Sequence, residues 1–224
     1  MIINGSAKVL LEETFDIENP EVSISTVSSA VKILESPDGK CHLTIYGKVE
    51  NAKDLAEFVE VSSTIRSLSI RVDKRNVGLR GLFSGGSSGF FLTLSLPKSA
   101  FLKIKSVSAD VEVGSTVRGI EAGTVSGDIA ILHNPTGLCN LKTVSGDIST
   151  KTFSSCQYSL RSVSGDIKVL VALNLEVDVD GKTVSGDLAS EISLNSNLDS
   201  QSESLGVVTI NTSTVSGDFT LARN

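Results

Sequence analysis

The hexapeptides Thr124-Val-Ser-Gly-Asp-Ile129 and Thr143-Val-Ser-Gly-Asp-Ile148 are identical and lie 19 residues apart. Variants recur on both sides of them: Ser106-Val-Ser-Ala-Asp-Val111, Ser162-Val-Ser-Gly-Asp-Ile167, Thr183-Val-Ser-Gly-Asp-Leu188 and Thr214-Val-Ser-Gly-Asp-Phe219. The valines of these copies follow one another at intervals of 18, 19, 19, 21 and 31 residues. So regular a period indicates a repeat architecture in which each unit stacks on the next. A degenerate further copy is Thr26-Val-Ser-Ser-Ala-Val31.

Each unit is rich in Val, Ile and Thr, which favour β-strands. A period of about 19 residues is too short for a helical hairpin and suits one coil of a β-solenoid, whose strands pair with their equivalents one coil away. We therefore predict an all-β fold, a β-helix-like stack of coils over residues 106–224. The longest interval contains a Ser- and Asn-rich insertion at 191–205, which we expect to be a loop.

The spacing within the repeat predicts side-chain directions. In an extended chain Val144, Gly146 and Ile148 share one face, which we assign to the interior. Ser145 and Asp147 then point outward. The parity changes before each Thr or Ser, and this change predicts a corner just ahead of the motif.

Residues 1–105 are also rich in β signals, and we expect them to be continuous with the solenoid. Strands are predicted at 7–11, 22–27, 30–34, 41–46 and 68–72. One helix is predicted at 51–64, capped by Asn51 and covering one end of the stack. The Gly- and Ser-rich segment 84–89 is expected to be the most flexible part of the chain.

Composition narrows the classes of function. Of 224 residues, 40% are hydrophobic and only 4% aromatic, with no Trp, so the core must consist of Val, Ile and Leu. The formal net charge of −6 argues against nucleic-acid binding, which needs clustered Lys and Arg.

The three cysteines, Cys41, Cys139 and Cys156, form no CxxC pair and are expected to be reduced thiols. The first residues resemble no signal peptide, so we expect a cytoplasmic protein, or a cell-surface one if the N-terminus is truncated. No stretch of about 18 apolar residues occurs, so no direct membrane span is expected.

Two sets of repeat residues are candidate sites. Asp110, Asp128, Asp147, Asp166, Asp187 and Asp218 should align along one edge. There they either accept backbone hydrogen bonds at a bend or, with Asp128, Asp147, Asp166 and Asp187 foremost, bind a cation such as Ca²⁺. The Ser and Thr rows beside them either satisfy one another or bind a glycan or a protein.

Catalytic and cofactor signatures are missing from the sequence. His42 and His133 belong to no metal-binding pattern, and the segment 84–89 has no following helix to cradle phosphate. Six copies of Ser-(Gly/Ala)-Asp argue for a structural role, because a catalytic residue is needed once.

The repeats together with two preceding segments, 79–89 and Phe90-Phe-Leu-Thr-Leu-Ser-Leu-Pro97, resemble the bacterial putative-adhesin family of unknown function. The resemblance implies a β-helical, toast-rack-like domain, and the family offers no functional residues to carry over.

We therefore expect a non-enzymatic binding or scaffold module that uses no cofactor. Its partner is expected to be an unknown protein or glycan, with homo-oligomer contacts through the solenoid ends. The alternatives are a carbohydrate-active β-helix enzyme and a Ca²⁺-stabilised β-roll.

Overall fold

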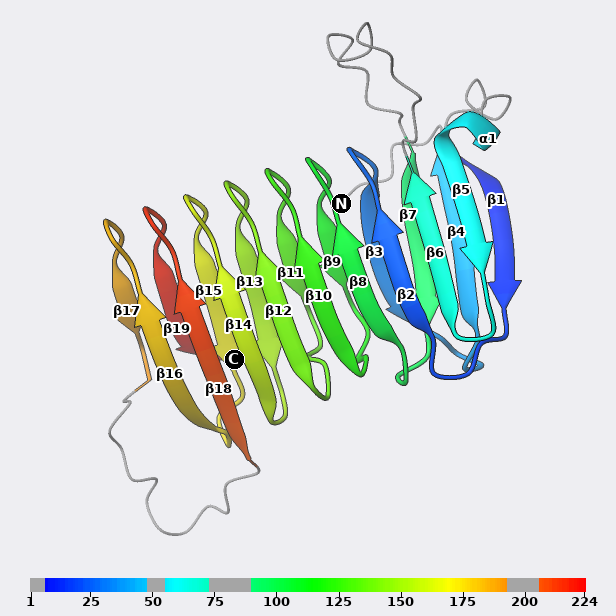
Figure 1. Cartoon of the computed structure of the whole chain (residues 1–224). Coiled ribbons are helices and arrows are strands. Elements are labelled where there is room, and N and C mark those ends of the chain that lie inside the picture. The colour runs from blue at the N-terminus through cyan, green and yellow to red at the C-terminus, as the bar shows by residue number, and fades with distance from the viewer. Residues whose placement is uncertain (1–6, 48–54, 73–89, 193–205) are drawn as a thin grey trace, which may run out of the picture.

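The computed structural model describes residues 7–47, 55–72, 90–192 and 206–224 and contains two facing β-sheets (Figure 1). Sheet A consists, in spatial order, of β1 (Lys8–Phe15), β4 (Cys41–Gly47), β7 (Phe91–Leu96), β3 (Ala30–Glu35), β9 (Val111–Val113), β11 (Ile129–Ile131), β13 (Ile148–Thr152), β15 (Ile167–Val171), β19 (Phe219–Arg223) and β17 (Leu188–Ser190). Sheet B consists of β16 (Glu176–Lys182), β18 (Val207–Ser213), β14 (Cys156–Arg161), β12 (Leu138–Lys142), β10 (Gly119–Gly123), β8 (Phe101–Lys105), β2 (Glu21–Ser25), β6 (Ser67–Val72) and β5 (Val59–Ser63).

Each coil of the repeat runs along a strand of sheet B, turns through the Thr-Val-Ser-Gly-Asp motif, and returns along a strand of sheet A. Equivalent residues lie directly beside one another in parallel register: Ile129 pairs with Ile148, and Ile148 pairs with Ile167. The predicted all-β stack of parallel coils is confirmed. The degenerate copy at 26–31 is also a coil corner, because it joins β2 to β3 and Val31 pairs with Val111.

The order of coils in space differs from their order in the sequence at both ends. The last coil, β18 with β19, lies between β14 with β15 and β16 with β17. Near the N-terminus, the coil of β2 and β3 lies between β8 with β9 and β6 with β7. Both sheets therefore continue without a break from the repeat into the N-terminal strands.

The core lies between the sheets and is filled by aliphatic side chains that alternate with outward residues. Strands β13 and β15 show this alternation, since every second residue is buried. Tyr158 is the largest fully buried side chain, and its hydroxyl hydrogen-bonds Thr152 Oγ1 at 2.7 Å. All three cysteines are buried and free, as expected of reduced thiols.

The N-terminal end is covered by antiparallel strands: β1 pairs with β4, β4 with β7, and β5 with β6. The strands predicted in this half are found within a few residues of their expected bounds. The helix is much shorter than predicted, because α1 spans only Leu55–Phe58 and the chain continues as β5. Val59 and Val61 are β-branched and alternate with Glu60, which suits pairing on the edge of sheet B better than a helix.

Two of the predicted loops fall outside the described residues, namely 84–89 and most of 191–205. Within the described residues, no helix has the length and apolar character needed to cross a membrane.

Candidate functional site

The corner of each coil is a tight turn stabilised by its first residue. Thr143 Oγ1 accepts a hydrogen bond from the Gly146 N–H at 2.9 Å, and Thr143 is buried. In the other coils, too, the first residue of the motif accepts a hydrogen bond on its hydroxyl from the backbone N–H three residues later. These residues are Thr26, Ser106, Thr124, Ser162, Thr183 and Thr214. A hydroxyl that captures a nearby N–H in this way favours a turn over an extended strand.

This turn overturns the predicted direction of the valines. Val144 is 44% exposed, whereas Ile148, assigned to the same face, is 1% exposed. The equivalent valines are also exposed, at Val27, Val107, Val125, Val163, Val184 and Val215. Strand parity holds only in extended backbone, and the motif bends at Val144, Ser145 and Gly146. The corner is thus the motif itself and not the position before it.

The glycine of the motif, which was assigned to the interior face, faces the backbone of the neighbouring coil. A Cβ at Gly146 would lie 2.0 Å from the carbonyl oxygen of Gly127, and one at Gly165 would lie 1.8 Å from that of Gly146. Because the obstructing atoms are backbone, no side-chain rotation can relieve the clash. Glycine at this position therefore permits the coils to approach closely.

The aspartates form a ladder, which we call the aspartate ladder. Asp147 Oδ1 accepts the N–H of Asp166 at 2.8 Å, and Asp128 Oδ1 accepts that of Asp147 at 2.8 Å. The same bond links Asp110 to Asp128, Asp166 to Asp218 and Asp218 to Asp187. Each hydrogen bond of the aspartate ladder joins a carboxylate of one coil to a backbone N–H of the next coil.

The serines of the motif also bind backbone and not one another. Ser145 Oγ donates to the Val125 carbonyl at 3.3 Å, and Ser164 Oγ to the Val144 carbonyl at 3.2 Å. The polar groups of the repeat thus hold successive corners together. Among the described residues, no cluster of three or more His, Cys, Asp or Glu side chains could hold a metal ion.

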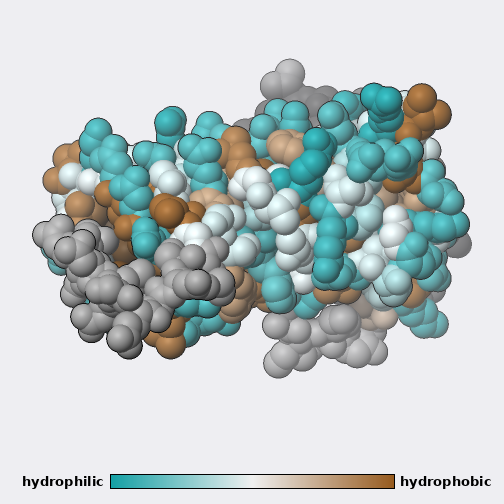
Figure 2. Space-filling view, turned by 90° about the horizontal axis from the view of Figure 1, so that it is seen from below, coloured by the Kyte–Doolittle hydropathy of each residue, from teal (hydrophilic) through white to brown (hydrophobic). Residues whose placement is uncertain are grey.

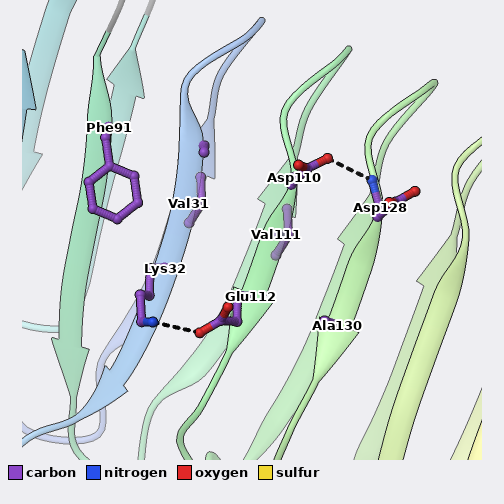
Figure 3. A pocket seen from close by; sticks show the side chains of 9 residues that line it. Val31, Lys32, Phe91, Asp110, Val111, Glu112, Asp128 and Ala130 are labelled. Atoms are coloured by element: carbon purple, nitrogen blue, oxygen red, sulfur yellow. Dashed lines mark hydrogen bonds and ion pairs between the residues drawn. The ribbon is translucent and has the colours of Figure 1, made fainter. Parts of the chain in front are cut away.

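A hollow of about 190 Å³ lies on the outer face of sheet A where this ladder begins (Figure 3). Ala30 occupies the place that Asp takes in later coils, between Phe91 on β7 and Asp110. Its small side chain leaves a gap bordered by the Phe91 ring and by the Lys32–Glu112 ion pair, whose Nζ and Oε1 atoms are 2.7 Å apart. Nothing in the sequence indicates this hollow, because only the order of strands in the sheet brings β7 beside β3.

The two histidines lie apart from both features. His42 Nε2 contacts Asp38 Oδ1 at 2.7 Å and His42 Nδ1 contacts Thr14 Oγ1 at 3.0 Å, all on the exposed side of β1 and β4. The hydrogen bond between Asp38 and His42, together with a second one from the Lys40 N–H, lowers the pKa of Asp38 to about 2. Cys41 beside it is buried, so the two side chains face opposite ways as predicted. His133 stacks near Phe153, with ring centroids 5.9 Å apart.

The rim opposite the motif carries the variable return loops. Figure 2 shows this rim from below, with hydrophilic and hydrophobic residues mixed along it. Phe153 and Leu173 are exposed apolar residues of these loops. The same residue types therefore recur from coil to coil at the motif corners and on the sheet faces, but not in the return loops.

The model of one protein family matches residues 19–169 and 123–222, a span that includes the N-terminal coils and all of the repeat corners. The chain belongs to the Toastrack DUF4097 family. A search of the curated proteins found no match. The fold of this toastrack chain is similar to two solved structures. One is described as a putative cell adhesion protein from Clostridium sporogenes (12% identity, 97% of this chain and 100% of that chain, TM-score 0.54).

The other is described as a putative adhesin from Bacteroides fragilis (14% identity, 97% of each chain, TM-score 0.51). At these identities the likeness concerns the fold. The resemblance noted in the sequence is confirmed, and the toastrack architecture accounts for the two facing sheets of coils.

Proposed function

We propose that this toastrack chain is a non-enzymatic binding or scaffold module whose ligand lies along ordered rows of outward side chains. The observation that carries the proposal is the parallel register, which places equivalent outward residues of successive coils about 4.8 Å apart along the molecule. Such a surface suits an extended partner. The adhesion function in the descriptions of the two similar structures belongs to the same class.

The residues that could act as catalytic groups are placed in a way that favours binding over catalysis. Ser145 Oγ and Asp147 Oδ1 bind the backbone of a neighbouring coil, as do most of their equivalents, and a side chain held in this way is not poised as a nucleophile or base. The chain Asp38–His42–Thr14 lies on the outward side of β1 and β4, where Asp38 and His42 are partly exposed to solvent, whereas a reaction site normally excludes water.

The test is incubation of the full chain with neutral and acidic polysaccharides, measuring both retention on the immobilised polymer and release of new reducing ends. We expect retention of at least one polymer and no release. Release of oligosaccharides that disappears in Thr14→Ala or Asp38→Asn would establish the enzyme alternative instead.

Thermal melts separate the binding module from a Ca²⁺-stabilised roll. A ligand that binds only the folded state must raise its stability. Because an oxygen of the carboxylate already accepts a backbone N–H at Asp110, Asp128, Asp147, Asp166 and Asp218, we expect the same Tm in millimolar Ca²⁺ and in EDTA. A rise of several degrees with Ca²⁺, lost in Asp147→Asn, would contradict this expectation.

A further inference from the structure

A row of cationic side chains crosses the outer face of sheet B just before the motif corners. In stack order its positions are Lys105, Gly123, Lys142, Arg161, Ser213 and Lys182, each paired with the next. We call this the basic row. Its four cations are exposed, and none forms an ion pair with a described residue. At about 4.8 Å per strand, the row is about 24 Å long.

The basic row repeats a pattern of cation, small residue, cation. Gly123 separates Lys105 from Lys142, and three coils further on Ser213 separates Arg161 from Lys182. A hollow opens at each small residue, of about 320 Å³ at Gly123 and about 360 Å³ at Ser213. The face therefore carries two hollows in line, each flanked by two cations of the basic row. Lys103, whose Nζ lies 3.9 Å from Glu121 Oε2, also lines the first hollow.

The second outward row supplies hydrogen-bonding groups to both hollows. Glu121 and Asn140 border the first, and Asn211 and Asp180 border the second. Asn140 Oδ1 is buried and has no hydrogen-bond partner among the described residues, although a buried acceptor normally has one. Each hollow thus combines cations for an anionic group with carboxylate and amide oxygens for hydroxyl donors.

We propose that sheet B binds a linear acidic polysaccharide along the basic row, which assigns a ligand class to the binding function proposed above and rests on it. The anionic groups of the polymer pair with Lys105, Lys142, Arg161 and Lys182, and its hydroxyls hydrogen-bond the amides and carboxylates beside them. A chain of sugars matches an array of exposed cations spaced by the strands of one sheet.

Nucleic acid fits this face less well. Glu121 and Asp180 would face its phosphates, and binding of single strands relies on stacking of bases on aromatic rings. Phe101 on β8 already contacts Lys103 and Arg118, whose charged groups lie 5.4 and 5.6 Å from its ring centroid.

The test measures the affinity of the full chain for polygalacturonate, the same polymer fully methyl-esterified, and a single-stranded oligonucleotide of equal charge. We expect binding of polygalacturonate that weakens with salt, because exposed ion pairs are screened. The methyl ester and the oligonucleotide should bind at least tenfold more weakly. Equal binding of either, or no binding of polygalacturonate, would overturn the proposal.

Matched variants locate the site. Lys142→Gln with Arg161→Gln should weaken binding at least tenfold. Lys151→Gln with Lys168→Gln removes the same charge from the outer face of sheet A on neighbouring coils and should change affinity less than twofold. All four side chains are exposed, so Tm should be unchanged in both variants. If Lys142→Gln with Arg161→Gln retains affinity, the basic row is not the site although the chain remains a binding module; release of oligosaccharides would instead refute the non-enzymatic function itself.

Discussion

At the scale of single residues, the glycine of the motif lies where a side chain would clash with the neighbouring coil. Replacing Gly146 with Ala places a Cβ 2.0 Å from a backbone oxygen, so adjacent coils must separate. We expect a loss of about 3 kcal/mol in the free energy of unfolding, at the upper end of the usual cost of overpacking. Urea unfolding of the purified variant measures it.

The control is Ser145→Ala on the same corner. It removes an exposed hydrogen bond of 3.3 Å and should cost less than about 1 kcal/mol. Equal losses in the two variants would show that the close approach of the coils does not constrain residue 146.

The buried thiols should make the free energy of unfolding fall as the pH rises in the alkaline range. Burial raises the pKa of Cys41 from 9.0 to about 11 and that of Cys156 to about 12. Because the raised pKa belongs to the folded state, the thiol contribution is complete below pH 9 and is lost as pH rises through 9 toward 11. We expect Tm to fall less steeply between pH 8 and 11 in Cys41→Ala than in the wild type.

A parallel slope in both proteins would show that Cys41 does not titrate differently on unfolding. Thiol labelling gives an independent check: at pH 8 iodoacetamide should modify the cysteines only after denaturation, since all three are buried.

At the scale of the element, the aspartate ladder tests how the corners are linked. In Asp147→Ala the Asp166 N–H loses its acceptor, which should cost about 1 kcal/mol. Asp147→Asn keeps an oxygen acceptor and removes one charge between two others, so its stability should equal or exceed the wild type at low salt. Urea unfolding of both variants makes the comparison, and equal destabilisation would mean that charge, not the acceptor, matters.

Elements also show where sequence reasoning succeeds and where it stops. The period of the motif predicted the stacked coils, because it can be read from the local sequence. The valine directions were wrong because a Thr Oγ1 bond converts an apparent strand into a turn. The helix at 51–64 was too long because pairing with β6 decides the conformation of Val59–Ser63. The cations of the basic row were visible in the sequence, but their alignment with Gly123 and Ser213 depends on register.

At the scale of the whole molecule, the order of coils could not be predicted. The motifs at Thr183 and Thr214 are nearly the same, so nothing local states which one stacks on β14 and β15. The structure places β18 and β19 there, with Ile210 and Phe219 buried, and leaves β16 and β17 at the end. Gly181 and the exposed Leu188 make β16 and β17 the less well-packed coil.

This arrangement predicts the effect of a truncation. A chain ending at residue 205 lacks β18 and β19, the neighbours of the terminal coil. We expect amide hydrogens of β16 and β17 to exchange at close to the unfolded rate, while β10 and β12 remain protected. Protection of β16 in the shortened chain would mean that this coil docks directly on β14.

The insertion of β18 and β19 between two earlier coils affects how the protein folds during its synthesis. Residues of β16 and β17 leave the ribosome before the coil on which they rest has been synthesised, and synthesis at 5–20 residues per second makes this delay last seconds. The stack cannot grow one coil at a time to its end. The terminal coil of β16 and β17 must wait, with its strand edges unpaired, until β18 and β19 have been synthesised and pair with it.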